Sequence, residues 1–215
     1  MLRRRDLLPT VFFLTICLPS SRMIEVSDKA EQLLDAAEDL CRTVGFNAFS
    51  YRDLADRVGI RTASIHYHFP GKADLGRAMA MRYRERFEQA LGGILRSDPT
   101  ANGRWNAFAS ALQRALGDGD KLCLGGMLSA EFSSLAPEIQ TEVTRFFQAG
   151  ESFVSHWLTA GVTSGELRLP QGQTADVLAR SLFSSMQGAM LAARACKDPT
   201  RLQSTSDWIL ETLRA

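Results

Sequence analysis

The sequence lacks a long hydrophobic run, closely paired cysteines and an excess of one charge. Its 215 residues include four scattered cysteines and no Cys-x-x-Cys pair, so neither a disulfide framework nor a zinc ribbon is supported. The 25 basic and 24 acidic residues almost cancel, which excludes binding of nucleic acid or anionic membranes by bulk charge alone. A hydrophobic content of 45% with seven prolines is typical of a folded globular protein. The scattered cysteines favour a reducing, cytoplasmic location.

Residues 1–22 are expected to form an extension outside the fold. Three consecutive arginines precede the apolar run Leu7 to Leu18, which has the outline of a secretory signal peptide. The run is too short to span a bilayer, Pro9 interrupts it, and no Ala-x-Ala cleavage site follows. We therefore favour translation from Met23 and no membrane partner. The alternative is a targeting segment, which would make this a secreted or membrane-tethered helical protein.

Motifs for catalysis and metal binding are also missing. There is no HExxH, GxSxG, P-loop or dinucleotide fingerprint in the sequence. His66 and His68 are two positions apart and diverge on a helix, so they do not form a metal pair. The segment from Gly117 to Asp120 is too short for a calcium loop. We expect a non-enzymatic protein with no cofactor; the rival is an enzyme or small-molecule carrier that uses a helical pocket.

The spacing of apolar residues is helical throughout, which predicts an all-α fold. Ser27 or Asp28 is expected to cap the first helix, and the Gly92-Gly93 pair to end the fourth. Gly59 separates two short helices, and this arrangement is typical of a helix-turn-helix unit. The helices are expected at about residues 30–44, 51–58, 62–68, 72–93, 103–116, 123–135, 137–162, 174–196 and 199–213.

The segment from Phe49 to Lys72 reads FSYRDLADRVGIRTASIHYHFPGK. Ser50 and Asp53 have the spacing of a capping box at the start of the first short helix. Apolar residues on both short helices are expected to clamp them together, leaving one face of the second helix free. That free face is polar, with hydroxyls, imidazoles and cations that suit phosphate oxygens and base edges in the major groove. The apolar residues of the clamp are Leu54, Ala55, Val58, Ile60 and Ile65.

From about Ser27 to Tyr83 the sequence resembles the DNA-binding domain of TetR/AcrR-type (tetracycline-repressor family) transcriptional regulators. The resemblance rests on Asp-Leu-Ala in the first short helix, the glycine turn, and Ser-Ile-x-Tyr-His-Phe ending in Gly-Lys. It implies a ligand-responsive homodimeric repressor that binds a palindromic double-stranded operator and is released by a small molecule or electrophile. The implied domains are a helix-turn-helix domain (23–72), a connecting helix (73–98) and an effector-binding and dimerisation domain (99–215).

The resemblance also implies individual DNA contacts. Ser50, Arg52, Tyr67 and Lys72 would hold backbone phosphates. Thr62, Ala63, Ser64 and His66 would face bases, although most members have Tyr where this chain has His66. Arg61 and His68 complete the predicted DNA-binding surface. An alternative for Tyr67 is packing against the first helix.

Charge is distributed unevenly along this part of the chain. Residues 42–86 hold nine basic residues against four acidic ones, whereas residues 25–39 hold six acidic residues against Lys29 alone. The local positive excess can attract phosphates although the whole chain is nearly neutral. Binding to DNA is then expected to weaken steeply with salt.

The second half of the chain is expected to hold the effector and the dimer contact. Helix 174–196 is rich in small residues that allow close helix approach, so it forms either a dimer face or a crowded internal core. Aromatic and methionine side chains are expected to line an apolar pocket or simply to fill the core. These residues are Trp105, Phe108, Met127, Phe132, Phe153, Trp157, Phe183 and Met186.

Cys123 is a candidate redox or electrophile sensor. It follows Lys121 at the predicted start of a helix, and both a cation and a helix N-terminus favour a thiolate. The phrase Leu-Cys-Leu-Gly at 122–125 is similar to one in a subgroup of the family whose regulators respond to electrophiles. The alternative is that Cys123 is a small buried hydrophobic residue.

Overall fold

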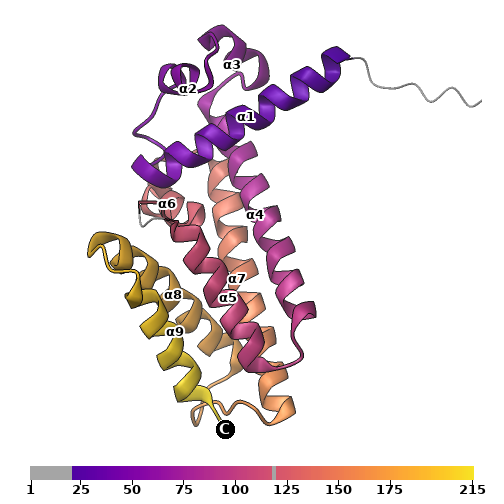
Figure 1. The fold of residues 1–215 in the computed structure, drawn as a ribbon, viewed down its shortest axis with the longest axis vertical. Helices are drawn as coiled ribbons and strands as arrows, with labels where there is room; N and C mark the ends of the chain where they lie inside the picture. Colours follow the sequence, from indigo (N-terminus) through magenta and orange to yellow (C-terminus); the bar gives the residue numbers. More distant parts are fainter. Residues whose placement is uncertain (1–20, 118–119) are drawn as a thin grey trace, which may run out of the picture.

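The computed structural model describes residues 21–117 and 120–215, with side chains from residue 28 onward (Figure 1). Within these residues the fold is all-α, as predicted, and the only strand-like pairing is an isolated bridge between Leu167 and Arg214. The elements are α1 (Ser21–Val44), α2 (Tyr51–Val58), α3 (Thr62–His68), α4 (Lys72–Ser97), α5 (Ala101–Leu116), α6 (Leu124–Ala130), the 3-10 helix η1 (Phe132–Ser134), α7 (Pro137–Ser164), α8 (Ala175–Ala195) and α9 (Thr200–Leu213).

Three predicted helix limits are wrong. The helix predicted at residues 123–135 is divided into α6 and the 3-10 helix η1, which are separated at Glu131. Helix α1 begins at Ser21, upstream of both Ser27 and Asp28, so neither residue caps it. Helix α4 continues through the glycine pair to Ser97. Leu91 and Ile94, on either side of that pair, are buried in the core. A glycine costs a helix about 1 kcal/mol, and burial of the flanking side chains outweighs that cost.

The predicted extension and Cys17 lie outside the described residues, apart from positions 21 and 22, which belong to α1. None of the helices in residues 21–117 and 120–215 has the length and apolar character that crossing a membrane requires.

Helices α1 to α3 form one end of the molecule, and α4 leads from them into a helical bundle (Figure 1). In the bundle α7 packs extensively on α4 and α8, and α8 packs on α9. The predicted domain limits at residues 72 and 98 fall at the two ends of α4.

Two clusters of buried apolar side chains hold the described residues together. One combines Leu33 and Cys41 of α1 with Ile65 of α3, but it also includes Leu124 of α6 and Ile139 of α7. The helix-turn-helix end therefore shares its core with the bundle. The other cluster fills the bundle around the stacked rings of Trp105 and Trp157, whose centroids are 4.4 Å apart.

The turn between α2 and α3 depends on Gly59. Its φ of +72° lies in the left-handed region, which glycine adopts without strain. A β-carbon at this position would meet no atom within 4 Å. The positive φ of Gly59, and not a lack of space for a side chain, therefore favours glycine at this position.

Replacement of Gly59 by alanine is expected to lower the free energy of unfolding by about 1 kcal/mol, because alanine is strained at positive φ. Gly59→Asn is the matched control, since asparagine tolerates this conformation better, and it should lose clearly less stability. Urea unfolding of both variants measures the difference. An equal loss in the two variants would contradict a conformational origin.

Candidate nucleic-acid interface

The position of α3 is fixed from inside the helix-turn-helix unit. Ile65 of α3 and Leu54 of α2 are completely buried, and both contribute to the core beneath the two helices. The Tyr51 hydroxyl donates a hydrogen bond to the Phe69 carbonyl oxygen at 2.9 Å. Burial raises the pKa of Tyr51 to about 12, so the phenol stays protonated and keeps this bond at physiological pH.

The start of α2 carries the predicted capping box. The Ser50 hydroxyl oxygen accepts from the backbone N–H groups of Arg52 and Asp53, at 3.2 and 3.4 Å. The Asp53 carboxylate accepts in return from the Ser50 backbone N–H at 2.7 Å. Ser50 thus has a structural role, in addition to the phosphate contact predicted for it.

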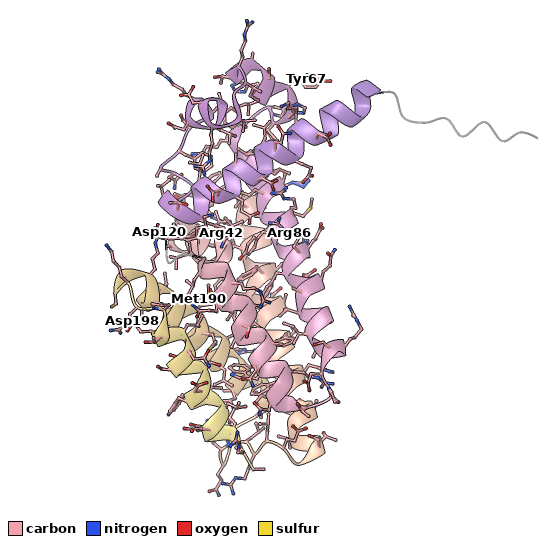
Figure 2. All side chains as sticks on the ribbon, viewed as in Figure 1. Arg42, Tyr67, Arg86, Asp120, Met190 and Asp198 are labelled. Atoms are coloured by element: carbon pink, nitrogen blue, oxygen red, sulfur yellow. The ribbon has the colours of Figure 1, made fainter. Side chains whose placement is uncertain are left out.

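The outward face of α3 is open to solvent. Arg61, Thr62, Ala63 and Ser64 are all exposed. Tyr67 is 75% exposed and extends away from α3 at the end of the molecule (Figure 2). This exposure excludes the alternative in which Tyr67 packs against the first helix. The face presents hydroxyl and guanidinium groups from a short rigid helix, which is the form that groove-reading elements take.

Three predicted contact residues are already engaged by the protein. The His66 ring packs edge-on against Tyr51, with centroids 4.9 Å apart, and its Nδ1 lies 3.0 Å from the Pro70 carbonyl oxygen. His68 is half-buried beside Tyr67, with ring centroids 5.2 Å apart. The Lys72 ammonium lies over the rings of Phe46 and Phe49, at 4.8 and 4.7 Å.

Lys72 also donates a hydrogen bond to the Phe49 carbonyl oxygen. Desolvation of the ammonium group by these neighbours lowers the pKa of Lys72. The Phe49 carbonyl oxygen uses one of the three N–H donors of the Lys72 ammonium. The DNA contacts assigned to His66, His68 and Lys72 stay predictions.

Comparison with known proteins agrees with this geometry. Residues 33–79 match the family model of the bacterial regulatory proteins of the tetR family. The HTH-type transcriptional repressor DhaR of Mycobacterium sp. (strain GP1) is 26% identical over 149 residues, which cover 68% of this chain and 73% of that protein.

Two solved structures resemble nearly the whole chain. A TetR-family regulator from Agrobacterium tumefaciens matches with a TM-score of 0.84 and 29% identity, over 88% of this chain and 100% of that one. A TetR regulator from Legionella pneumophila matches with a TM-score of 0.77 and 32% identity, over 86% of this chain and 96% of that one. The chain belongs to the TetR family. It is a DNA-binding transcriptional regulator, and the family identifies it as a regulator rather than an enzyme.

Much of the positive charge of this TetR-family regulator is neutralised by α1. Arg82 forms ion pairs with Glu31 and Asp35 at 2.6 and 2.8 Å, and Arg86 pairs with Glu38. Further ion pairs join Arg42 to Glu38 and Arg57 to Asp39. The pairs of Arg57, Arg82 and Arg86 hold α1 against α2 and α4, whereas the Arg42 pair lies within α1. The local excess of basic residues is therefore not all available to DNA.

The exposed basic residues next to the open face are Arg52 and Arg61. Neither forms an ion pair with any residue whose side chain the structure describes. These two guanidinium groups are therefore the most available partners for phosphate on this side of the regulator.

The regulator has a cavity of about 340 Å³ between α1, α4 and α5. Among the pocket residues predicted from sequence only Phe108 lines it, together with the sensor candidate Cys123. Trp105, Trp157, Phe183 and Met186 are buried in the bundle core. Phe132 lies on η1 and is partly exposed, and the Met127 sulfur contacts Arg194 at 3.5 Å. Their role in effector binding stays a prediction.

The sequence interpretation missed most of the lining residues. Phe87, Leu91 and Ile94 face the cavity from α4. Their spacing of four and three residues predicts a shared helical face. That spacing could have drawn attention to α4, but a shared face does not by itself distinguish a cavity wall from a filled core.

The surroundings of Cys123 differ from the prediction in one respect. The thiol is buried and accepts a hydrogen bond from the Tyr83 hydroxyl at 3.5 Å. The Lys121 ammonium lies 2.6 Å from the Asp39 carboxylate, so its charge is largely neutralised there. The predicted cationic stabilisation of a Cys123 thiolate is correspondingly weak.

The Asp39 carboxylate joins α1 to Arg57 of α2 and to Lys121 of the α5–α6 connection. The Lys121 hydrogen bond, supported by the charge of Arg57, lowers the pKa of Asp39 below its ordinary value of 3.8. The stabilisation from this charge is therefore fully present above pH 3.8 and is lost as the pH falls through the lowered pKa.

We expect Asp39→Asn to lower the free energy of unfolding by about 1 kcal/mol at neutral pH, since the pairs are partly exposed. The difference from the unchanged protein should shrink as the pH falls below 3.8 and through the lowered pKa of Asp39. Denaturant unfolding at several pH values measures it, with the exposed Asp56→Asn as control. A loss independent of pH would show that the carboxylate charge is not responsible.

Proposed function

We propose that this TetR-family regulator is a cytoplasmic, homodimeric repressor. It binds a palindromic operator through the outward face of α3 and leaves it when an effector enters the cavity beside α4. The observation that carries the proposal is the open polar face of α3, with Tyr67 75% exposed above a rigid apolar base. Thr62, Ala63 and Ser64 supply the base-facing positions, and Arg52, Arg61 and Tyr67 supply the phosphate contacts.

The proposed dimer face lies on α8 and α9. The small residues of α8 separate into two sets: Ala179, Ala189 and Ala193 are buried inside the bundle, whereas Ser181, Ser184, Ser185 and Gly188 are exposed. Large apolar side chains flank the exposed set. Val177, Leu191 and Trp208 are 52%, 49% and 60% exposed. A second copy packed on this face would cover them and would pair two α3 helices for a two-fold symmetric site.

The DNA that flanks the regulator's own gene is the first target to test. Binding to a palindrome there should weaken steeply as salt rises, and a single half-site should bind far more weakly because it engages one α3 only. Arg61→Gln should reduce the slope of log affinity against log salt by about 1 per protomer. Fluorescence anisotropy at several salt concentrations gives the slope.

The matched control for this experiment is Arg96→Gln, an equally conservative change at the exposed far end of α4. It should leave the slope unchanged. If Arg61→Gln had the slope of the unchanged protein, or if no sequence preference appeared against nonspecific competitor, the proposed DNA face would be rejected.

An electrophile is a second candidate effector, because the Cys123 side chain lines the cavity. Among the other cysteines, Cys41 is fully buried with a pKa raised by burial to about 12, and Cys196 is exposed. A small electrophile that enters the cavity would therefore meet Cys123, while one that stays in solution would meet Cys196.

N-ethylmaleimide tests this route in the full chain with Cys17→Ser and Cys196→Ser. We expect one slow modification by intact mass, because access to the cavity limits it, together with reduced operator affinity. The additional change Cys123→Ser should abolish both effects. Full loss of operator affinity in the Cys123→Ser protein after treatment would exclude Cys123 as the sensor.

A further inference from the structure

The cavity beside α4 is chemically divided. Its longer wall is apolar and includes Phe87, Leu91, Phe108 and Leu112. At one end the lining changes to Glu38 of α1 together with Tyr83 and Arg86 of α4. Figure 2 shows Arg86, and Arg42 of α1, at the level where α1 crosses the bundle. The volume of about 340 Å³ is within the range of small-molecule sites.

The Glu38 carboxylate at the polar end is surrounded by three arginines. Its Oε1 atom lies 3.6 Å from a guanidinium nitrogen of Arg42. Its Oε2 atom pairs with Arg86 and lies 3.5 Å from Arg82. Glu38 is only 9% exposed. A cationic ligand would have to displace arginines to reach this carboxylate, so the cavity does not favour a cation.

Arg86, unlike Glu38, has hydrogen-bonding groups that no ion pair of the described residues uses. Its side chain is 48% exposed, and the Glu38 contact is its one ion pair with the described side chains. That contact uses a single terminal nitrogen, whereas a guanidinium carries five N–H donors in a planar fork. The fork matches a carboxylate, which can accept two parallel hydrogen bonds. The polar end of the cavity thus has unused donors for an anionic head group.

We propose that the effector is an amphipathic carboxylate whose apolar tail lies along α4 and α5. Its head group forms an ion pair with Arg86 and breaks the ion pair between Arg86 and Glu38. This inference rests on the proposed ligand-responsive function and specifies the ligand class and the switch. Glu38 belongs to α1, which packs on α2, and Arg86 belongs to α4. Loss of their ion pair therefore removes a direct link between the helix-turn-helix unit and the effector-binding bundle.

The link is strengthened one turn further along α1. The Arg42 guanidinium donates hydrogen bonds to the carbonyl oxygens of Ala115 in α5 and Leu122 before α6. Movement of α1 at Glu38 is thereby coupled to Leu122, which directly precedes Cys123 of the cavity lining. A ligand that binds better when the Glu38–Arg86 pair is open shifts the regulator toward that state, and operator affinity falls in proportion.

Calorimetric titration of the full chain tests this with three probes that are each built on a ten-carbon chain: decanoate, decanol and decyltrimethylammonium. Decanoate should bind at least about tenfold more tightly than the other two, as expected for charge-assisted hydrogen bonds. Arg86→Gln should remove this preference, while the control Arg96→Gln should keep it. Glu38→Gln should tighten decanoate binding, because it releases Arg86; circular dichroism confirms that each variant is folded.

Equal binding of decanoate and decanol, absence of decanoate binding, or a preference that survives Arg86→Gln would each overturn the proposal. Operator binding is measured separately, without probe and then with decanoate. Salt-dependent operator binding that decanoate does not weaken would refute the switch but leave the DNA-binding function intact. Failure to bind an operator without any probe would refute the proposed function, while the calorimetric preference for carboxylate would still decide the ligand class.

Discussion

The contact between α1 and α4 underlies the arrangement of the whole regulator. One face of α1 is apolar and buries Leu33, Ala37 and Cys41 in the core below the helix-turn-helix unit. Its acidic residues meet Arg82 and Arg86 of α4. Because α4 also runs through the bundle, its apolar and arginine contacts orient the DNA-binding end relative to the effector-binding end. Each of these pairs joins a largely buried side chain to one that is about half exposed or more, so each contributes only modestly to stability.

On α3 the inward side chains anchor the helix, and the outward side chains are free to contact DNA. Ile65 and Phe69 anchor α3, and Tyr51 ties its end to α2 through the Phe69 carbonyl. These contacts are satisfied without DNA, so binding an operator requires little ordering of the backbone. The outward residues can then vary without disturbing the anchor, and this separation allows one fold to read different operators.

The sequence predicted the local features of the site well. Leu54, Gly59 and Ile65 defined a helix-turn-helix with the correct helix limits, because apolar spacing and a glycine turn are local signals. The ends of α1 and α4 could not be predicted in the same way. Gly92 and Gly93 favour a break locally, but Leu91 and Ile94 are held by side chains distant in sequence. Tertiary burial overrides helix propensity at such positions.

The sequence by itself determined the all-α class, the DNA-binding unit and the polar character of α3, since each follows from residues close together in the chain. Only the tertiary structure decided which charges are free. Arg82 and Arg86 are neutralised by acids of α1 more than forty residues away, Lys72 is held over Phe46 and Phe49, and a cavity remains between Phe87 and Phe108. Ion pairing and packing join residues remote in sequence, and no local pattern records which of them meet.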